Sequence, residues 1–205
     1  MTLRKPAVAS MPLNNLILNR WSPRSFSDQL VDNDTLVALF EAARWAASCN
    51  NLQPWRYIIA TKADPDAWET AQNCTLDRNQ RWTRTAPVIG YVMSEPVPLP
   101  GDRENLWHQF DAGMASAQLT LEAESRGLVV HQFAGIDYDA VRKTYRVPEN
   151  VDIICGIVFG YQGEPENLTE DLPGREIEPR VRKDLSEFIY KGAYGESAPE
   201  VMSGG

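Results

Sequence analysis

Histidine and cysteine are scarce in this sequence, which limits the chemistry that it can carry. There are two histidines, His108 and His131, and three widely spaced cysteines, Cys49, Cys74 and Cys155. No CxxC pair and no group of histidines and carboxylates at helical spacing occurs, so we expect no metal site. The three cysteines form no disulfide framework, which favours a reducing, cytoplasmic setting. His131 falls in a strand-like segment, where a packed, hydrogen-bonded histidine is a common outcome.

Several motifs of known enzyme classes are also missing. There is no P-loop, no GxGxxG after a strand and no GxSxG, which argues against P-loop NTPases, Rossmann dehydrogenases and elbow-type hydrolases. No apolar run is long enough to cross a bilayer, and the first residues lack the apolar core of a signal peptide. We therefore expect no membrane partner. The formal net charge of -8 argues against nucleic acid, because its binding needs a basic face.

In other respects the composition is ordinary. The 205 residues are 43% hydrophobic and 23% charged, as in an average globular protein. We expect one domain over residues 1–195 and a flexible tail over 196–205. Helical and strand-like segments alternate, which predicts an α+β or α/β sandwich. The expected strands are 56–61, 86–93, 129–133 and 153–160. The expected helices are a short one before Asn19, one with N-caps offered by Asp32, Asn33 and Asp34 that runs to Arg44, one capped by Asp64 that runs to 82, one over 103–126 and one capped by Asp137 or Asp139.

The longest expected helix, 103–126, carries two kinds of side chain. Gly127 follows it in the position typical of a helix stop. Its apolar stripe consists of Phe110, Met114, Ala117 and Leu121. Small side chains gather beside that stripe, at Ala112, Gly113, Ala115 and Ser116. They allow another backbone to come close, in a helix pair or a subunit interface, and core packing explains the apolar stripe equally well.

The segment 44–55 concentrates polar side chains between Trp45 and Trp55. Pro54 prevents a continuous helix here and favours an extended Gln53. Groups that both donate and accept hydrogen bonds come from Ser48, Asn50, Asn51 and Gln53. One interpretation is a rigid loop that holds a planar, polar heteroaromatic ligand. The other is a turn whose Asn and Ser side chains bond their own backbone.

Two arginines bracket a serine in the segment 20–26. Arg20 and Arg24 present planar donor forks that match a phosphate, Ser22 adds a hydroxyl, and Pro23 keeps the backbone out of a regular helix. A solvated basic loop is the alternative. Clustered arginines in an acidic chain favour an anion-binding site.

No acid, base or nucleophile accompanies these groups. Cys49 has neither a neighbouring histidine nor a CxxC partner, which argues against a reactive thiol. What remains is a set of side chains suited to hold an anion and a ring. Such a set is typical of proteins in which a cofactor does the chemistry.

Most of the chain, roughly Leu16 to Phe188, resembles the FMN-dependent nitroreductase-like oxidoreductases. The matching segments, in the order of that family, are 20–26, 41–48, 51–55, 111–114, 127–135 and 179–182. The resemblance implies a three-layer α/β/α sandwich whose central mixed β-sheet is flanked by helices. It also implies an obligate homodimer with two FMN sites at the interface.

The resemblance further implies which residues hold the cofactor. They are Arg20, Trp21, Ser22, Arg24, Ala47, Ser48, Cys49, Asn51, Ala134, Gly135, Arg180 and Arg182. The arginines and Ser22 would hold the phosphate and the ribityl chain of FMN. The Ser48–Asn51 loop would meet the flavin from the partner subunit, and the Ala134–Gly135 turn would contact the ring through its backbone.

Three members of this set depart from the residues common in the family. They are Trp21, Ala47 and Cys49, which would contribute through backbone or packing. The resemblance leaves open whether Arg81 also reaches the phosphate.

The activity implied is that of an NAD(P)H-dependent oxidoreductase. Hydride would pass from NADH or NADPH to FMN and then, in a ping-pong reaction, to a nitroaromatic, a quinone or a similar small acceptor. The alternatives keep the fold with another flavin reaction, such as dehalogenation, flavin breakdown or dehydrogenation, or with a non-catalytic FMN carrier or sensor. The connector 95–101 is short where relatives often carry substrate-covering helices, so the sequence does not identify the acceptor.

Overall fold

A four-stranded sheet forms the centre of the molecule. The computed structural model describes residues 3–169 and 171–202, without the side chains of 201 and 202. The strands are β1 (Trp55–Thr61), β2 (Val88–Ser94), β3 (Leu128–Phe133) and β4 (Asp152–Tyr161). Their order is β1-β2-β4-β3, and every neighbouring pair is antiparallel. The prediction of a mixed sheet is therefore wrong for the part of the chain that is described.

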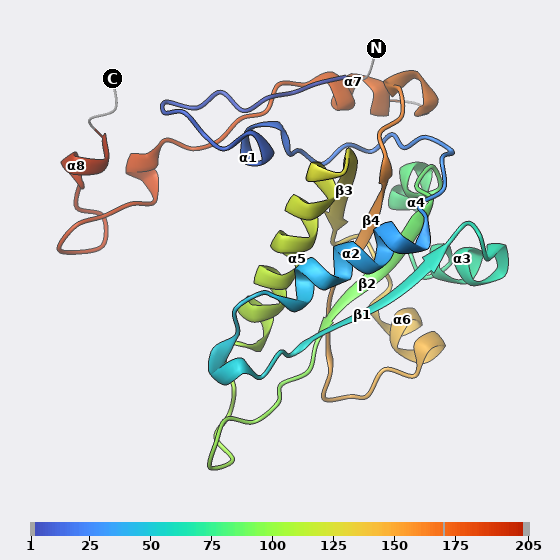
Figure 1. The fold of residues 1–205 in the computed structure, drawn as a ribbon, viewed down its shortest axis with the longest axis horizontal. Coiled ribbons are helices and arrows are strands. Elements are labelled where there is room, and N and C mark those ends of the chain that lie inside the picture. The colour runs from blue at the N-terminus through green and yellow to red at the C-terminus, as the bar shows by residue number, and fades with distance from the viewer. Residues whose placement is uncertain (1–2, 170, 203–205) are drawn as a thin grey trace.

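Helices cover both faces of this sheet (Figure 1). On one face lie α2 (Asn33–Arg44) and α5 (His108–Ser125), and on the other lie α3 (Pro65–Gln72), α4 (Asp77–Thr83) and α6 (Tyr138–Tyr145). Each face has its own apolar core, because alternate side chains of a strand point to opposite sides. On β4, Ile157 and Phe159 join the core under α2 and α5, whereas Val158 joins the other. The shorter elements are α1 (Asn15–Asn19), η1 (Cys49–Asn51), η2 (Pro165–Asn167), α7 (Leu172–Ile177), η3 (Leu185–Glu187) and α8 (Pro199–Met202).

Three helices begin at the capping residues expected from the sequence. The side chain of Asp32 accepts the backbone N–H of Thr35 at 2.8 Å at the start of α2. Asp64 caps α3, and Asp137, rather than Asp139, caps α6. These carboxylates satisfy backbone donors that the first turn of a helix leaves without partners.

The single helix predicted over 64–82 is two helices, α3 and α4. Between them the chain pairs with the turn that follows β3, through an isolated bridge from Thr75 to Ile136. The N–H of Leu76 donates to the carbonyl of Gly135 at 3.0 Å, and the N–H of Asp137 donates to Cys74 at 2.9 Å. These hydrogen bonds use backbone groups that a continuous helix would need, so the helix ends.

Helix α5 starts later than predicted and buries a different face. Residues before it form a turn that closes on a bridge between Leu99 and Arg103, which delays the helix to His108. The buried side chains are Asp111, Ala112, Ala115, Ser116, Leu119, Thr120 and Ala123. Phe110 and Met114, assigned to the apolar stripe, are 68% and 38% exposed. The small side chains therefore face the sheet and α2, and much of the apolar stripe is left on the surface.

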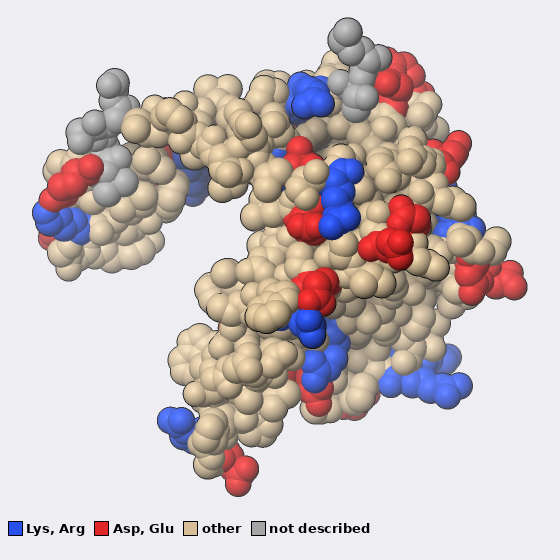
Figure 2. Space-filling view, viewed as in Figure 1, with Lys and Arg blue, Asp and Glu red and all other residues tan. Residues whose placement is uncertain are grey.

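The C-terminal residues form an arm that projects from the body (Figures 1 and 2). The side chains of Leu185 and Phe188 on this arm are 37% and 57% exposed. Tyr190 pairs with Ser197 within the arm, and Pro199–Met202 forms α8 inside the segment expected to be a flexible tail. The arm therefore carries its own local structure. Among the described residues, none of the helices has the length and apolar character needed to cross a membrane.

The core under α2 gives a test of the fold. We expect Leu39→Ala to lower the free energy of unfolding by about 3 kcal/mol, because Leu39 is completely buried. Val37, on the same helix and 68% exposed, is the matched control, and Val37→Ala should change it by less than about 0.5 kcal/mol. Urea unfolding followed by circular dichroism measures both. Equal effects of the two substitutions would contradict this packing.

Candidate functional site

The arginine-containing segment 20–27 is held by hydrogen bonds along its backbone. Four N–H groups of the segment donate to the rest of the protein: those of Arg24 and Ser25 to Oε1 of Glu176 (2.7 and 3.1 Å), that of Phe26 to Oγ1 of Thr85 (3.2 Å) and that of Ser27 to the carbonyl of Tyr161 (2.9 Å). Its carbonyls are bonded in turn by Nδ1 of His131 at Pro23 (2.9 Å), by Oγ1 of Thr85 at Arg24 (3.1 Å) and by the N–H of Gly163 at Ser25 (2.9 Å). These partners come from several different parts of the fold. The segment is thus fixed rather than a solvated loop.

His131 occupies the floor of this region. It stands on β3, and its ring lies 4.4 Å from the ring of Trp82 on α4. Burial, together with the charges of Arg24 and Arg20, lowers the pKa of His131 to about 4. At neutral pH the imidazole is uncharged, so Nδ1 carries a proton and donates it to the carbonyl of Pro23. The sequence analysis expected a packed, hydrogen-bonded histidine, and that expectation is confirmed.

Arginines from the two ends of the chain meet beside the segment. Burial lowers the pKa of Arg20, and the nearby charges of Arg180 and Arg182 lower it further. Nη1 of Arg20 donates to the Ser22 hydroxyl at 3.2 Å. Arg180 is anchored by hydrogen bonds to the carbonyls of Lys5 (2.7 Å) and Leu18 (2.9 Å). Four of the predicted cofactor residues therefore lie close together, and mutually repelling guanidinium groups of this kind favour an anion between them.

A second group of predicted residues lines a cavity of about 410 Å³. Arg24, Ala134 and Gly135 lie in its wall. Of the other lining residues, only Arg81 was raised from the sequence as a possible cofactor residue; they are Arg78, Asn79, Arg81, Trp82, His131, Leu172 and Arg175. Arg78 and Arg81 stand on α4. Two arginines on one short helix of an acidic chain are the feature of the sequence that could have indicated them as anion-binding residues. Arg175 comes from α7 and had no such signal.

The backbone is closely approached at Gly135. A Cβ atom added there would lie 1.9 Å from Oδ1 of Asn79, well inside van der Waals contact. Gly135 has no side chain, so the Ala134–Gly135 turn presents bare backbone to the cavity, and a larger residue there would require the Asn79 side chain to move. A flat ligand edge can therefore reach the peptide groups of this turn, between the arginines of α4 and Arg24.

The polar loop before β1 is strained. Asn50, Asn51 and Gln53 have φ values of 49°, 56° and 49°, in the left-handed region that favours glycine. The prediction of an extended Gln53 is therefore wrong, because its N–H closes the loop by donating to the Ser48 hydroxyl at 3.1 Å. That bond agrees with the turn interpretation for Ser48. Strain of this kind is common at ligand sites, and the ligand interpretation of the loop stays a prediction.

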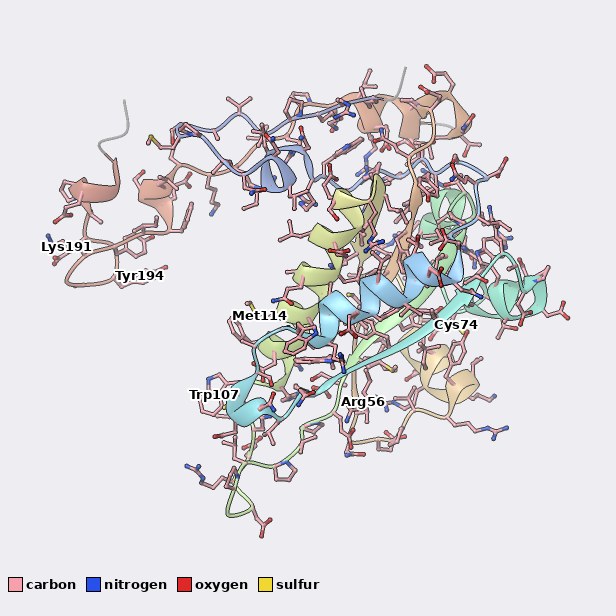
Figure 3. The ribbon with its side chains drawn as sticks, viewed as in Figure 1. Arg56, Cys74, Trp107, Met114, Lys191 and Tyr194 are labelled. Carbon is pink, nitrogen blue, oxygen red and sulfur yellow. The ribbon has the colours of Figure 1, made fainter. Side chains whose placement is uncertain are left out.

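This loop lies at the opposite end of α5 from the arginines. The N–H of Cys49 donates to Asp111 near the start of α5 at 3.0 Å, whereas Arg20 faces the charge of Glu124 near its end. Thirteen residues of helix separate Asp111 from Glu124, which is about 20 Å at 1.5 Å per residue. Figure 3 shows Trp107 and Met114 at the loop end, away from the terminal segments. One copy of the chain does not bring the two groups together.

Two features of the predicted set lie outside both groups. Ala47, Ser48 and Cys49 line a shallow cavity of about 300 Å³ together with Trp107, Phe110, Asp111 and Met114. Trp21 is buried, and the ammonium group of Lys5 lies 4.3 Å from the centre of its ring. Trp21 borders a separate cavity of about 470 Å³ at the ends of β4 and α5.

Sequence comparison identifies the family. The model of the nitroreductase family matches residues 17–161, which is more than half of the chain. The chain belongs to the nitroreductase family. The predicted resemblance is confirmed, and with it the prediction of an NAD(P)H-dependent flavin oxidoreductase with FMN as cofactor.

Relatives of this nitroreductase-family protein come from several bacteria. A 15.4 kDa protein of Mycolicibacterium smegmatis is 36% identical over 120 residues, which cover 58% of this chain and 80% of the relative. A 4-nitrobenzoate reductase of Nocardioides sp. (strain LMS-CY) is 23% identical, over 85% of this chain and 89% of its own. An NADPH-dependent FMN reductase of Bacillus subtilis (strain 168) is 27% identical, over 77% and 67% respectively.

A solved structure described as an oxidoreductase containing FMN has the same fold. It superimposes with a TM-score of 0.87 at 29% identity, and the match covers 96% of this chain and 100% of that one. A nitroreductase family protein of Clostridium difficile 630 is more distant, with a TM-score of 0.68 and 21% identity over 89% of this chain and 99% of that one.

The residues present fit FMN. Its phosphate needs several cationic donors, which the group of Arg20, Ser22, Arg180 and Arg182 supplies. The edge of its ring needs polar partners and close backbone approach, which the 410 Å³ cavity supplies at Gly135. Arg20 belongs to the first group and Arg24 to the second, and the charges of both lower the pKa of His131, which indicates that the two groups lie near each other.

The buried imidazole gives a test by pH. The unfolded chain binds a proton at His131 below about pH 6.5, whereas the folded chain binds it only near pH 4, so folding becomes less favourable as pH falls between these values. We expect a loss of about 3 kcal/mol across this window, at about 1.4 kcal/mol for each pKa unit. His131→Asn keeps an N–H donor for Pro23 and removes the titration. Urea unfolding at several pH values measures both proteins, and parallel pH profiles for the two would contradict the assignment.

Proposed function

We propose that this protein transfers hydride equivalents from NADH or NADPH to a nitroaromatic, quinone or similar small acceptor through bound FMN, by a ping-pong mechanism. The observation that carries the proposal is the meeting of Arg20, Arg180 and Arg182 beside a cavity whose wall includes the backbone of the Ala134–Gly135 turn. When bound, FMN supplies the redox chemistry, accepting hydride from the nicotinamide and passing electrons to the acceptor.

In this proposal the protein's own residues bind FMN and orient it. Arg20, Ser22, Arg180 and Arg182 hold the phosphate. Arg24, Arg81 and the Ala134–Gly135 turn meet the edge of the ring. The guanidinium groups around the cavity favour negative charge there, so they support electron transfer to the ring electrostatically. The names of two relatives, 4-nitrobenzoate reductase and FMN reductase (NADPH), support the proposed acceptor and donor classes.

Flavin binding is the direct test. We expect the purified protein to bind FMN and to lose its visible absorbance with NADH or NADPH under anaerobic conditions. Oxidation by a panel of nitroaromatics and quinones should then restore it. A protein that binds no FMN, or whose flavin neither nicotinamide reduces, would contradict the proposal.

Substitution of Arg20 connects this activity to the site. Arg20→Ala should weaken FMN binding by at least about tenfold, because it removes a charge-assisted contact to the phosphate. Arg84→Ala is the matched control, since Arg84 is an exposed arginine that pairs with Glu69 on the outside of the helical layer. Fluorescence titration gives both affinities, and circular dichroism checks that both variants fold.

We further propose that the working protein is a homodimer in which the Ser48–Asn51 loop of one copy completes the flavin site of the other. The support is geometric, because the loop and the arginines stand at opposite ends of α5 within one chain. Apolar side chains on the surface offer the contact area. They include Phe110 and Met114 on α5, and Val181, Phe188 and Tyr194 on the C-terminal arm.

A charge on the exposed face of α5 tests the dimer. Phe110→Asp should convert a dimer into a monomer and weaken FMN binding by at least about tenfold, because it places a carboxylate in an apolar contact. Tyr138→Asp is the control, since Tyr138 is 43% exposed on α6, on the other face of the sheet. Light scattering after gel filtration gives the mass. A wild-type monomer that binds FMN tightly would refute the assembly.

A further inference from the structure

Glu176 is a buried carboxylate that the proposed function does not use. It lies on α7, and only 1% of it is exposed. Its Oε1 accepts two backbone hydrogen bonds, from Arg24 N at 2.7 Å and from Ser25 N at 3.1 Å. Its Oε2 accepts no hydrogen bond and lies 3.9 Å from Nη1 of Arg24. A buried carboxylate is unfavourable unless it is paired, so its contacts with the arginine segment compensate for its burial.

These contacts join segments that are about 150 residues apart in the sequence. The same residue also receives a bond at its backbone, because Lys5 Nζ donates to the carbonyl of Glu176 at 2.7 Å. Arg180, four residues farther along, donates to the carbonyl of Lys5. Figure 1 shows the N-terminal and C-terminal segments running side by side above the sheet. Glu176 is thus the point at which the C-terminal segment is fastened to the arginine segment.

The direction of the two N–H groups determines how Glu176 affects the conformation of the arginine segment. The N–H groups of Arg24 and Ser25 both point to Oε1 of Glu176. Together these two hydrogen bonds fix the orientation of the two peptide planes between Pro23 and Ser25. The other side of the same segment carries the Arg20 to Ser22 contact. Release of the peptide planes would therefore let the phosphate donors move relative to Arg180 and Arg182, which follow Glu176 in the chain.

We propose that Glu176 is a positioning residue, which holds the Arg20–Ser25 segment and the Arg180–Arg182 segment in the geometry that binds the FMN phosphate. The inference rests on the proposed function, since it concerns the same cofactor. It assigns Glu176 a geometric role through Oε1, and no contact with the flavin. A carboxylate acting by charge alone would repel the phosphate instead.

Two substitutions at this position separate geometry from charge. Glu176→Gln keeps an amide oxygen in the place of Oε1 and removes the charge. Glu176→Asp keeps the charge and withdraws the carboxylate by one methylene. Glu178→Ala is the control for charge, because Glu178 is exposed close by and acts, like Glu176, on the charge of Lys5. Affinities for FMN and for riboflavin, which lacks the phosphate, are measured on each full-length protein by fluorescence titration.

We expect Glu176→Asp to weaken FMN binding by about tenfold while riboflavin binding changes by less than about twofold. Glu176→Gln should retain FMN binding within about threefold, and Glu178→Ala should match the wild type. The inference is overturned by unchanged FMN binding in Glu176→Asp, by an equal loss for FMN and riboflavin, or by a larger loss in Glu176→Gln than in Glu176→Asp. A wild-type protein that binds neither flavin would instead contradict the proposed function, so the two failures are distinguishable.

Discussion

Repulsion among guanidinium groups is the constraint on which the rest of the structure depends. Burial and the charges of Arg180 and Arg182 lower the pKa of Arg20, and burial and the charge of Arg182 lower the pKa of Arg180, although these residues come from opposite ends of the chain. Without an anion between them, such a cluster disfavours its own formation. Hydrogen bonds from Arg180 to two main-chain carbonyls hold it in place. The fold therefore holds like charges close together, an arrangement that an anion bound between them would stabilise.

The sheet supplies the rigidity for that arrangement. The arginine segment is bonded to residues following β4, to His131 on β3 and to Thr85 before β2. β2 is buried along its whole length, and most of β3 and β4 is buried in the two apolar cores, where close packing limits how far the strands can shift. The segment that contains Arg20 and Ser22, the proposed phosphate donors, is thus positioned by its contacts with the sheet. The loop that contains Asn50 is positioned separately, by a bond to the other end of α5.

The sequence predicted those parts of the fold that short-range rules determine. The four strands and the caps at Asp32 and Asp64 follow from local composition and periodicity. Long-range contacts decided the errors. The break between α3 and α4 arises because Thr75 pairs with the turn after β3, which is some sixty residues away. The left-handed Gln53 arises because Ser48 accepts its N–H, and this overrides the preference that Pro54 imposes.

The site itself was predicted unevenly for the same reason. Arginine pairs that stand near each other in the sequence could be found, whereas Arg175 joins the cavity only through the path of the C-terminal segment. The buried face of α5 was also assigned wrongly, since a helix with apolar residues on one stripe and small residues on another can bury either. Close packing against α2 and the sheet selected the small residues, which left Phe110 and Met114 on the surface.

The chemistry available in the 410 Å³ cavity depends on which of its lining side chains can gain or lose a proton. Among the residues lining the 410 Å³ cavity, His131 alone belongs to the type that titrates near neutral pH, and burial lowers its pKa to about 4. Its one proton-bearing nitrogen is already committed to Pro23. The arginines stay charged, so the lining offers fixed positive charge and hydrogen-bond donors but no acid or base at neutral pH. This lining therefore supplies no proton at neutral pH, and its contribution is to bind, orient and stabilise charge.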